Sequence, residues 1–189
     1  MTTICGIDEA GRGPIIGSLF MAGVVIEPAQ EAVLKKMGVK DSKLLTPKKR
    51  EALFDEIQKV VKSFKVIRVA PDEIDEAVQS ENTNLNWLEA THAVTIINEL
   101  KPASAIIDCP SPNIKAYTAF IEKKLTHKAK LLCAHHADTD YVVVGAASIL
   151  AKVLRDREIA ALREKIGIDF GSGYITDPKT KTFVESYWD

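Results

Sequence analysis

Short apolar runs alternate along this chain with longer amphipathic segments, in which apolar residues recur at helical spacing. Apolar runs over residues 3–8, 18–27 and 64–70 predict three strands in the first part of the chain. Little lies between the first two runs, whereas a short helical segment over 29–36 and a stronger helix over 47–62 separate the second run from the third. This order predicts an antiparallel meander at the front of the fold.

The helix expected over 47–62 has both a start signal and an apolar stripe. Thr46 suits the N-cap, where a side-chain oxygen accepts a hydrogen bond from a free backbone N–H, and Pro47 suits the first helical position. The stripe consists of Leu53, Ile57, Val60 and Val61. Such a stripe is typical of a helix that packs one face on a core.

Helix and strand alternate in the second part of the chain. A short acidic helix should begin at Pro71, and the last helix should end within 183–188. The remaining elements are expected to be helices over 85–100, over 113–125 and within 141–166, with strands over 103–108 and 129–134. This alternation is typical of parallel strands joined by right-handed crossovers. We expect one α/β domain over residues 1–189, with a mixed sheet, flanking helices and a helical C-terminal segment from about residue 141.

The expected topology brings distant acidic residues together. The first strand should lie centrally, beside the fourth, so that Asp8 and Asp108 end neighbouring strands. Glu9 follows Asp8 directly, and Asp138 follows the fifth strand. Carboxylates this close repel one another unless cations lie among them, and Mg²⁺ prefers such oxygen ligands. Two ions roughly 4 Å apart could then clamp the attacking and leaving oxygens of a phosphodiester cleavage.

The adjacent acids Asp8 and Glu9 present a geometric difficulty, because neighbouring strand residues point to opposite faces. To share a site, the strand must end or bulge there, or Glu9 must reach around it. The glycines at positions 11 and 13 favour a strand end.

Each acid also has an alternative interpretation. A single acid at the end of a strand is often a turn or helix-cap residue. Asp140 is a rival to Asp138 as the fourth acid, and Asp156 lies among charged neighbours that favour salt bridges on a helix surface.

Composition adds only broad bounds. Of the 189 residues, 46% are hydrophobic, as in an ordinary globular protein, and the net charge of −1 gives no overall signal for nucleic acid. Lys and Arg outnumber acids over residues 1–65 and acids dominate 72–76, so a basic face could form locally.

The chain has three cysteines, Cys5, Cys109 and Cys133, which we expect to be reduced residues of the core. With neither a signal peptide nor a membrane-spanning run, we expect a cytoplasmic protein that binds no membrane.

Five sequence blocks match the motifs of one known family. The first is GIDEAGRGP over 6–14, a highly specific signature. The others are KDSK over 40–43 with LTPKKRE over 45–51, IID over 106–108, HAD over 136–138 with AASILAKV over 146–153 and RDR over 155–157, and GSGY over 171–174 with DPKT over 177–180. Together they cover nearly the whole chain. They resemble the type 2 ribonuclease H family, specifically ribonuclease HII in its shorter archaeal forms.

The resemblance implies an RNase H-like fold with a five-stranded mixed sheet flanked by helices. It implies endonucleolytic hydrolysis of RNA in RNA–DNA hybrids and at single ribonucleotides in duplex DNA, leaving 5′-phosphate and 3′-hydroxyl ends. Two divalent ions, Mg²⁺ or Mn²⁺, would be held by Asp8, Glu9, Asp108 and Asp138 as catalytic acids. Asp8 would bridge the ions, Asp138 would help hold the one that activates water, and the other two acids the one near the leaving oxygen.

Substrate contacts are implied in the same way. Gly11, Arg12 and Gly13 would recognise the ribonucleotide together with Tyr174, because a 2′-hydroxyl is what distinguishes RNA at such a junction. Lys43 would contact a phosphate. The expected partners are RNA–DNA hybrids and ribonucleotide-containing duplex DNA, bound by a monomer.

Other conspicuous side chains are given structural roles. We expect Lys152, Arg155 and Arg157 on a helix surface, and Trp87 and Trp188 as packing residues rather than base-stacking platforms.

Two further functions remain open. Another RNase H-like nuclease that acts on DNA would cleave all-DNA duplexes. A hybrid-binding protein without turnover would bind duplexes irrespective of magnesium and release no product, although the presence of all four acids argues against it.

Overall fold

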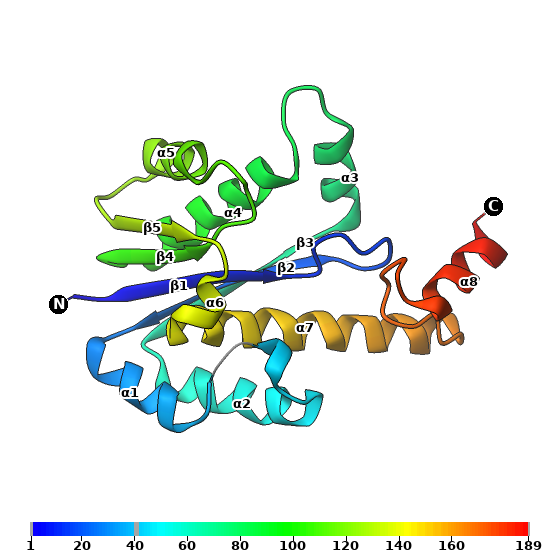
Figure 1. The fold of residues 1–189 in the computed structure, drawn as a ribbon, viewed down its shortest axis with the longest axis horizontal. Coiled ribbons are helices and arrows are strands. Elements are labelled where there is room, and N and C mark those ends of the chain that lie inside the picture. The colour runs from blue at the N-terminus through cyan, green and yellow to red at the C-terminus, as the bar shows by residue number, and fades with distance from the viewer. Residues whose placement is uncertain (1, 40–41, 189) are drawn as a thin grey trace.

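The computed structural model describes residues 2–39 and 42–188, and a five-stranded mixed sheet lies at its centre (Figure 1). The strands are β1 (Ile4–Ala10), β2 (Leu19–Ile26), β3 (Ser63–Val69), β4 (Ser104–Asp108) and β5 (Lys130–Ala134), in the order β3-β2-β1-β4-β5. β1 pairs antiparallel with β2 and parallel with β4, while β2–β3 is antiparallel and β4–β5 parallel. The predicted meander, the central first strand and the parallel additions are confirmed.

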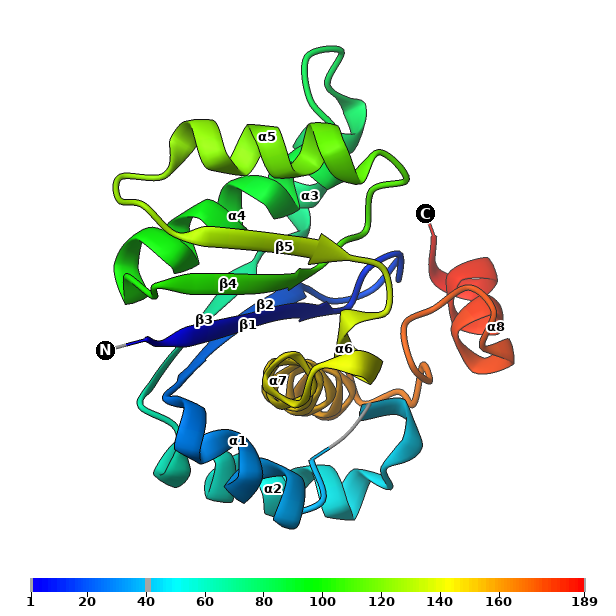
Figure 2. The same ribbon diagram turned by 60° about the vertical axis from the view of Figure 1, so that its left-hand side comes forward.

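Helices cover both faces of this sheet (Figure 2). On one face lie α1 (Pro28–Lys36), α2 (Pro47–Val60) and the long α7 (Val142–Ile166), and on the other lie α3 (Pro71–Gln79), α4 (Leu85–Leu100) and α5 (Ile114–Lys124). α8 (Pro178–Tyr187) sits beyond the far end of α7, at the right of Figure 1.

Two short elements were not predicted. They are the 3-10 helix η1 (Ser42–Leu44) and the single turn α6 (Ala137–Asp140). Neither is long enough to show a periodic pattern of apolar residues, which is why the sequence gives no signal for them. Lys40 and Asp41 of the second motif lie outside the described residues.

The side chains of β1 and β2 alternate between two buried layers. Ala22 and Val24 pack with α1, α2 and α7, whereas Met21 and Cys5 pack with α4 and α5. Gly6 lets the start of α7 approach β1 directly, because a Cβ there would lie 2.4 Å from the carbonyl carbon of Val143. This close approach fixes the long helix against the strand that carries the first acids.

The predicted details of caps and cysteines hold in the structure. The Thr46 hydroxyl oxygen accepts a hydrogen bond from the backbone N–H of Lys49 at 3.3 Å, as expected of an N-cap. The cysteines are free thiols buried in the core, and they are Cys5, Cys109 and Cys133. Within residues 2–39 and 42–188, the structure contains no helix with the length and hydrophobicity needed to cross a membrane.

The two tryptophans differ. Trp87 packs against Phe120, with 4.8 Å between ring centroids, as predicted. Trp188 is 78% exposed, so the expectation that it packs is wrong. It follows the end of α8, and that helix packs instead through Phe183 against Phe170, with 5.5 Å between ring centroids.

Candidate active site

β1 does not end at Asp8 as predicted, but stays paired with β2 through Ala10. Asp8 and Glu9 therefore leave the strand on opposite faces. Pairing with β4, however, stops at Ile7 and Ile107. Asp8 and Glu9 therefore lie beyond the last β1–β4 pair, and their carboxylates nevertheless come together with that of Asp108.

The first three predicted acids meet at this edge. Carboxylate oxygens of Asp8, Glu9 and Asp108 all lie within 4.8 Å of one another. The parallel register of β1 and β4 explains the convergence, because it brings the carboxyl ends of both strands to the same place. Three oxygens at this spacing can ligate one divalent cation.

The cluster is electrostatically unfavourable without a cation. Burial, with smaller contributions from the charges of Asp108 and Asp138, raises the pKa of Asp8 to about 7. Burial and the charge of Asp8 raise the pKa of Glu9 well above its ordinary value. The pKa of Asp108 is also raised, mainly by burial. Acids held in this way bind either protons or a cation more readily than solvated carboxylates do.

Asp138 lies on α6 and is not among the three acids whose oxygens lie within 4.8 Å of one another. It is 2% exposed, and its Oδ2 is 3.4 Å from the Nζ of Lys43. Its Oδ1 is buried and finds no hydrogen-bond partner among the residues that the structure describes. Its neighbour Ala137 donates its backbone N–H to Asp108 at 2.8 Å, and the charge of Asp138 raises the pKa of both Asp8 and Asp108. An unsatisfied buried oxygen beside three clustered carboxylates fits a divalent cation.

The rival acids lie elsewhere. Asp140 is exposed and lines a separate small pocket with Ile4 and Ile26, so it does not join the cluster. Asp156 forms salt bridges with Lys152 at 2.5 Å and Arg50 at 3.3 Å. Its predicted role as an ion-pair residue is confirmed, although Arg50 comes from α2 rather than from the same helix.

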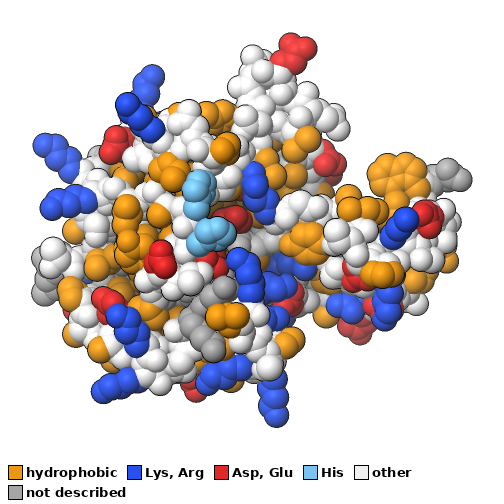
Figure 3. All heavy atoms as spheres, viewed as in Figure 1, with side chains coloured by type: hydrophobic (Ala, Val, Ile, Leu, Met, Phe, Trp, Pro, Cys, Tyr) orange, Lys and Arg blue, Asp and Glu red, His pale blue; other side chains and the backbone are white. Residues whose placement is uncertain are grey.

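A cleft of about 340 Å³ opens over the acids. Its lining includes Asp8, Glu9, Asp108, Gly11, Arg12, Lys43, Tyr174, Ser42, Ser148 and Lys152. Gly13 follows on the exposed part of the same loop as Gly11. Four of the predicted substrate residues thus line the same cleft as three of the predicted ligands, whereas Gly13 and Asp138 are not part of its lining. Acidic side chains also gather near the middle of the face in Figure 3, beside histidines and with Lys and Arg next to them.

The Gly11 loop and the Tyr174 loop are joined through their backbones. The N–H groups of Ile15 and Ile16 both donate to the carbonyl oxygen of Gly173, at 2.9 and 3.3 Å. Gly11 has a φ of 94°, and a Cβ there would lie 2.5 Å from the carbonyl oxygen of Ser18. Only glycine suits this position, both for its backbone conformation and for its close contact.

The Arg12 side chain is held in place by two residues of α4. Its Nε donates to Oε1 of Glu89 at 2.9 Å, and a guanidinium nitrogen donates to Oδ1 of Asn86 at 2.7 Å. Glu89 is fully buried, and burial raises its pKa to about 7. Sequence reasoning missed both partners. The available signal was Glu89 itself, a carboxylate beside Ala90 on the apolar face of the predicted helix.

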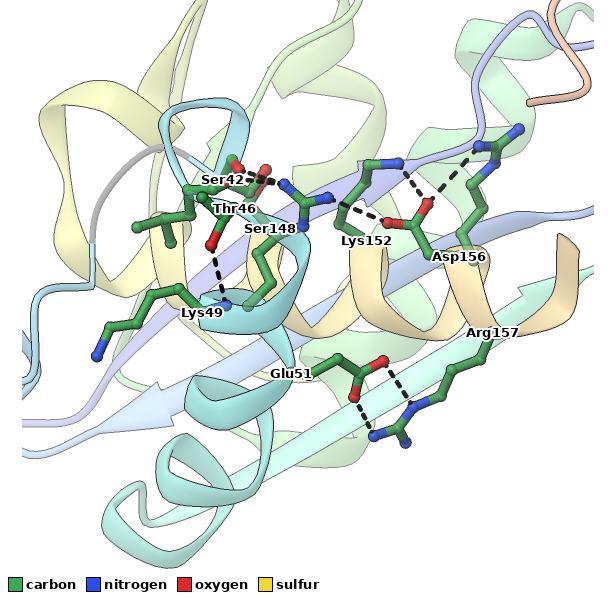
Figure 4. A network of polar contacts seen from close by, with 11 residues as sticks. Ser42, Thr46, Lys49, Glu51, Ser148, Lys152, Asp156 and Arg157 are labelled. Carbon is green, nitrogen blue, oxygen red and sulfur yellow. Dashed lines mark hydrogen bonds and ion pairs between the residues drawn. The ribbon is translucent and has the colours of Figure 1, made fainter. Parts of the chain in front are cut away.

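A second polar network supports the opposite wall of the cleft (Figure 4). Arg50 donates to the carbonyl oxygens of Ser42 and Leu45, at 3.0 and 2.7 Å, and pairs with Asp156 of α7. The hydroxyls of Ser42 and Ser148 are 2.8 Å apart. These contacts hold η1, and with it Lys43, against α7.

The predicted helix-surface basic residues do not behave alike. Arg157 is exposed and pairs with Glu51 at 2.6 Å, as expected. Lys152 is partly exposed and lines the cleft. Arg155 is 2% exposed, so its assignment to the surface is wrong. The side of α7 that it occupies is covered by the loops that carry Gly11 and Tyr174, which local sequence cannot show.

A five-stranded mixed sheet in which acids from two adjacent central strands converge at a polar cleft has the arrangement of a metal-dependent nuclease. Residues 5–189 match the family described as Ribonuclease HII. The chain belongs to this family of metal-dependent endoribonucleases, which act on RNA–DNA hybrids.

Named relatives support the assignment over nearly the whole chain. Ribonuclease HII of Pyrococcus furiosus is 45% identical over 187 residues, which cover 98% of this chain and 81% of the relative. Ribonuclease HII of Methanosarcina barkeri is 41% identical over 188 residues, covering 96% of this chain and 83% of the relative.

Solved structures share the fold. Ribonuclease H2 from Pyrococcus horikoshii OT3 superimposes with a TM-score of 0.90 at 42% identity, covering 99% of this chain and 87% of that one. RNase HII of Archaeoglobus fulgidus, solved in a complex with PCNA, gives 0.89 at 39% identity, covering 98% and 86%. Bst-RNase HIII shows likeness of fold alone, with a TM-score of 0.78 at 22% identity over 98% of this chain and 63% of that one.

Proposed function

We propose that this protein cuts the RNA strand of RNA–DNA hybrids and also cuts duplex DNA at a single embedded ribonucleotide. Hydrolysis at a two-ion centre would leave 5′-phosphate and 3′-hydroxyl ends. The observation that carries this proposal is the meeting of Asp8, Glu9 and Asp108 within 4.8 Å at a cleft lined also by Arg12 and Tyr174.

The four acids have distinct places in this proposal. Asp8, Glu9 and Asp108 would hold one divalent cation, and Asp138 with its unsatisfied Oδ1 would help hold a second, with Asp8 contributing to both. When bound, Mg²⁺ or Mn²⁺ supplies water activation and stabilises the charge on the leaving oxygen. Lys43 neutralises part of the Asp138 charge and offers a cation to a substrate phosphate.

Recognition of RNA is assigned to the other side of the cleft. The backbone of Gly11–Gly13 and the Tyr174 hydroxyl read the 2′-hydroxyl of the ribonucleotide. Arg12 contacts a neighbouring phosphate while α4 holds its other nitrogens. We propose that the enzyme acts as a monomer.

A cleavage assay tests the function. The enzyme is incubated with end-labelled duplexes that contain a single ribonucleotide, an RNA strand, or DNA only, each with and without Mg²⁺. Cleavage of the first two substrates, dependent on Mg²⁺, supports the proposal. Cleavage of the all-DNA duplex would instead favour a DNA nuclease, and binding without product in either condition would favour a hybrid-binding protein.

A further inference from the structure

Arg155 lies at the point where the two proposed recognition loops meet. Its guanidinium carbon is 4.7 Å from the centre of the Tyr174 ring, and one of its nitrogens donates to the carbonyl oxygen of Ser172. A Cβ at Gly11 would lie 3.3 Å from its Cγ, and one at Gly173 would lie 3.3 Å from its terminal nitrogen. One side chain thus packs against both loops.

The polar contacts of Arg155 are few for a buried cation. Its Nε finds no acceptor within residues 2–39 and 42–188, and the nearest carboxylate, Asp156, is 3.9 Å from its other terminal nitrogen. Burying a weakly paired charge costs stability, so an ion pair does not explain this arginine. What the guanidinium does provide is a flat surface that stacks on an aromatic ring while its edge donates hydrogen bonds.

Direct contact with nucleic acid does not explain Arg155 either. The side chain is 2% exposed, whereas phosphate-binding cations must reach the surface. Arg157, two residues further along α7, provides an internal comparison. It also stacks on a ring, that of Phe54 at 4.4 Å, but on the exposed surface of the helix and in a pair with Glu51.

We propose that Arg155 is a positioning residue that sets the selectivity of the enzyme for ribonucleotides. It holds the Tyr174 ring at a fixed distance from the Gly11 backbone, and so fixes the width of the gap in which a 2′-hydroxyl is read. This inference rests on the proposed recognition role of Tyr174 and the Gly11 loop. It adds Arg155 as the residue that keeps Tyr174 in a fixed position relative to the Gly11 loop.

The test compares two substrates. kcat and KM are measured for Arg155→Met and Arg155→Lys on a duplex with a single ribonucleotide and on a long RNA–DNA hybrid. A displacement of Tyr174 by about 1 Å can cost up to 10²-fold, so we expect the kcat/KM ratio of the single-ribonucleotide substrate to the hybrid to fall roughly 10- to 100-fold. Lys keeps the charge but not the flat stacking surface, so it should not rescue the ratio.

Arg157→Met serves as the matched control and should leave the ratio unchanged. An equal fall for both substrates in Arg155→Met would indicate a purely structural role and overturn the inference. If Arg155→Met does not fold, as judged by circular dichroism, Arg155→Lys carries the test alone, and wild-type selectivity in that variant overturns the inference.

A double mutant separates this inference from the proposed function. In a Tyr174→Ala background, Arg155→Lys should change the ratio by less than roughly 3-fold, because groups that act through each other are non-additive. Full additivity would refute Arg155 as a positioning residue for Tyr174 while leaving the recognition role of Tyr174 intact. If Tyr174→Ala alone leaves single-ribonucleotide cleavage unchanged, the recognition role itself fails. Binding is measured separately in the same variants with Asp8→Asn added, which prevents cleavage. The affinity of each variant for a ribonucleotide-containing duplex is compared with its affinity for an all-DNA duplex.

Discussion

The carboxylate of Asp108 accepts a hydrogen bond from the backbone N–H of Ala137 at 2.8 Å. Asp108 ends β4 and Ala137 begins α6, the turn that carries Asp138. One carboxylate therefore has two tasks: one oxygen fixes the start of α6, and the group as a whole belongs to the acidic cluster. The position of the fourth acid depends on the third.

Two substitutions at Asp108 separate these tasks. In Asp108→Asn, the side-chain oxygen can still accept from Ala137, but the charge is lost. We expect thermal stability to be retained and Mg²⁺-dependent cleavage to fall sharply. Asp108→Ala removes the acceptor as well and should also lower the free energy of unfolding by about 1 kcal/mol. Melting temperature and cleavage rate are measured on both variants, and equal stability losses would contradict the proposed link to α6.

Asp8→Asn should abolish Mg²⁺-dependent cleavage and leave the fold intact. Asp8 is the acid shared between the two proposed ions and the most buried of the three clustered acids. Asparagine preserves the size of the side chain, so circular dichroism should be unchanged. Asp140→Asn is the matched control, because that acid lies outside the cluster, and it should retain activity. Wild-type rates from Asp8→Asn would rule out the assignment of the site.

Stability without metal should fall as pH rises. The pKa of Asp8 is raised from 3.8 to about 7 in the folded protein, so between these values the folded state binds more protons than the unfolded state. Stability is then lost as pH increases through this window, by at most roughly 4 kcal/mol at 1.36 kcal/mol per pH unit. The raised pKa values of Glu9 and Asp108 act in the same direction.

The corresponding measurement is a melting temperature at pH 5 and pH 8, with and without Mg²⁺. Mg²⁺ should stabilise the protein more at pH 8, because it binds the ionised cluster and not the protonated one. Asp8→Asn should flatten the pH dependence and reduce the Mg²⁺ effect. A Mg²⁺ shift of the same size at both pH values would show that the ion binds elsewhere.

The arrangement of the sheet could be predicted because it depends on the order of elements along the chain. Apolar runs locate β1 and β4, and the rule for parallel crossovers places Asp8 beside Asp108. The continuation of β1 through Ala10 could not be predicted, since it depends on pairing with Phe20 of β2. The glycines at positions 11 and 13 predict that the strand ends near Asp8, but pairing with β2 extends it.

The supporting residues of the site were missed for a different reason. Glu89 and Arg155 are charged residues within helices, and such residues are usually solvated. Their burial results from tertiary contacts, with Arg12 in one case and with the Tyr174 loop in the other. Sequence motifs therefore identify the acids of the site. They do not identify Glu89 and Arg155, the buried residues that orient Arg12 and Tyr174.

The pairing of Arg12 with Glu89 can be divided into a structural and a functional part. The Arg12 side chain is 38% exposed, so solvent screens the pair. Arg12→Ala should cost roughly 1 kcal/mol at pH 8, because the pKa of Glu89 is already about 7 and the buried carboxylate takes up a proton once its cation is gone. Replacing Glu89 by Leu in the same protein removes that buried polar group. Arg12→Ala/Glu89→Leu should therefore regain most of the melting temperature but keep the raised KM for a hybrid substrate, since no cation reaches the phosphate. Recovery of KM along with stability would mean that Arg12 only neutralises Glu89.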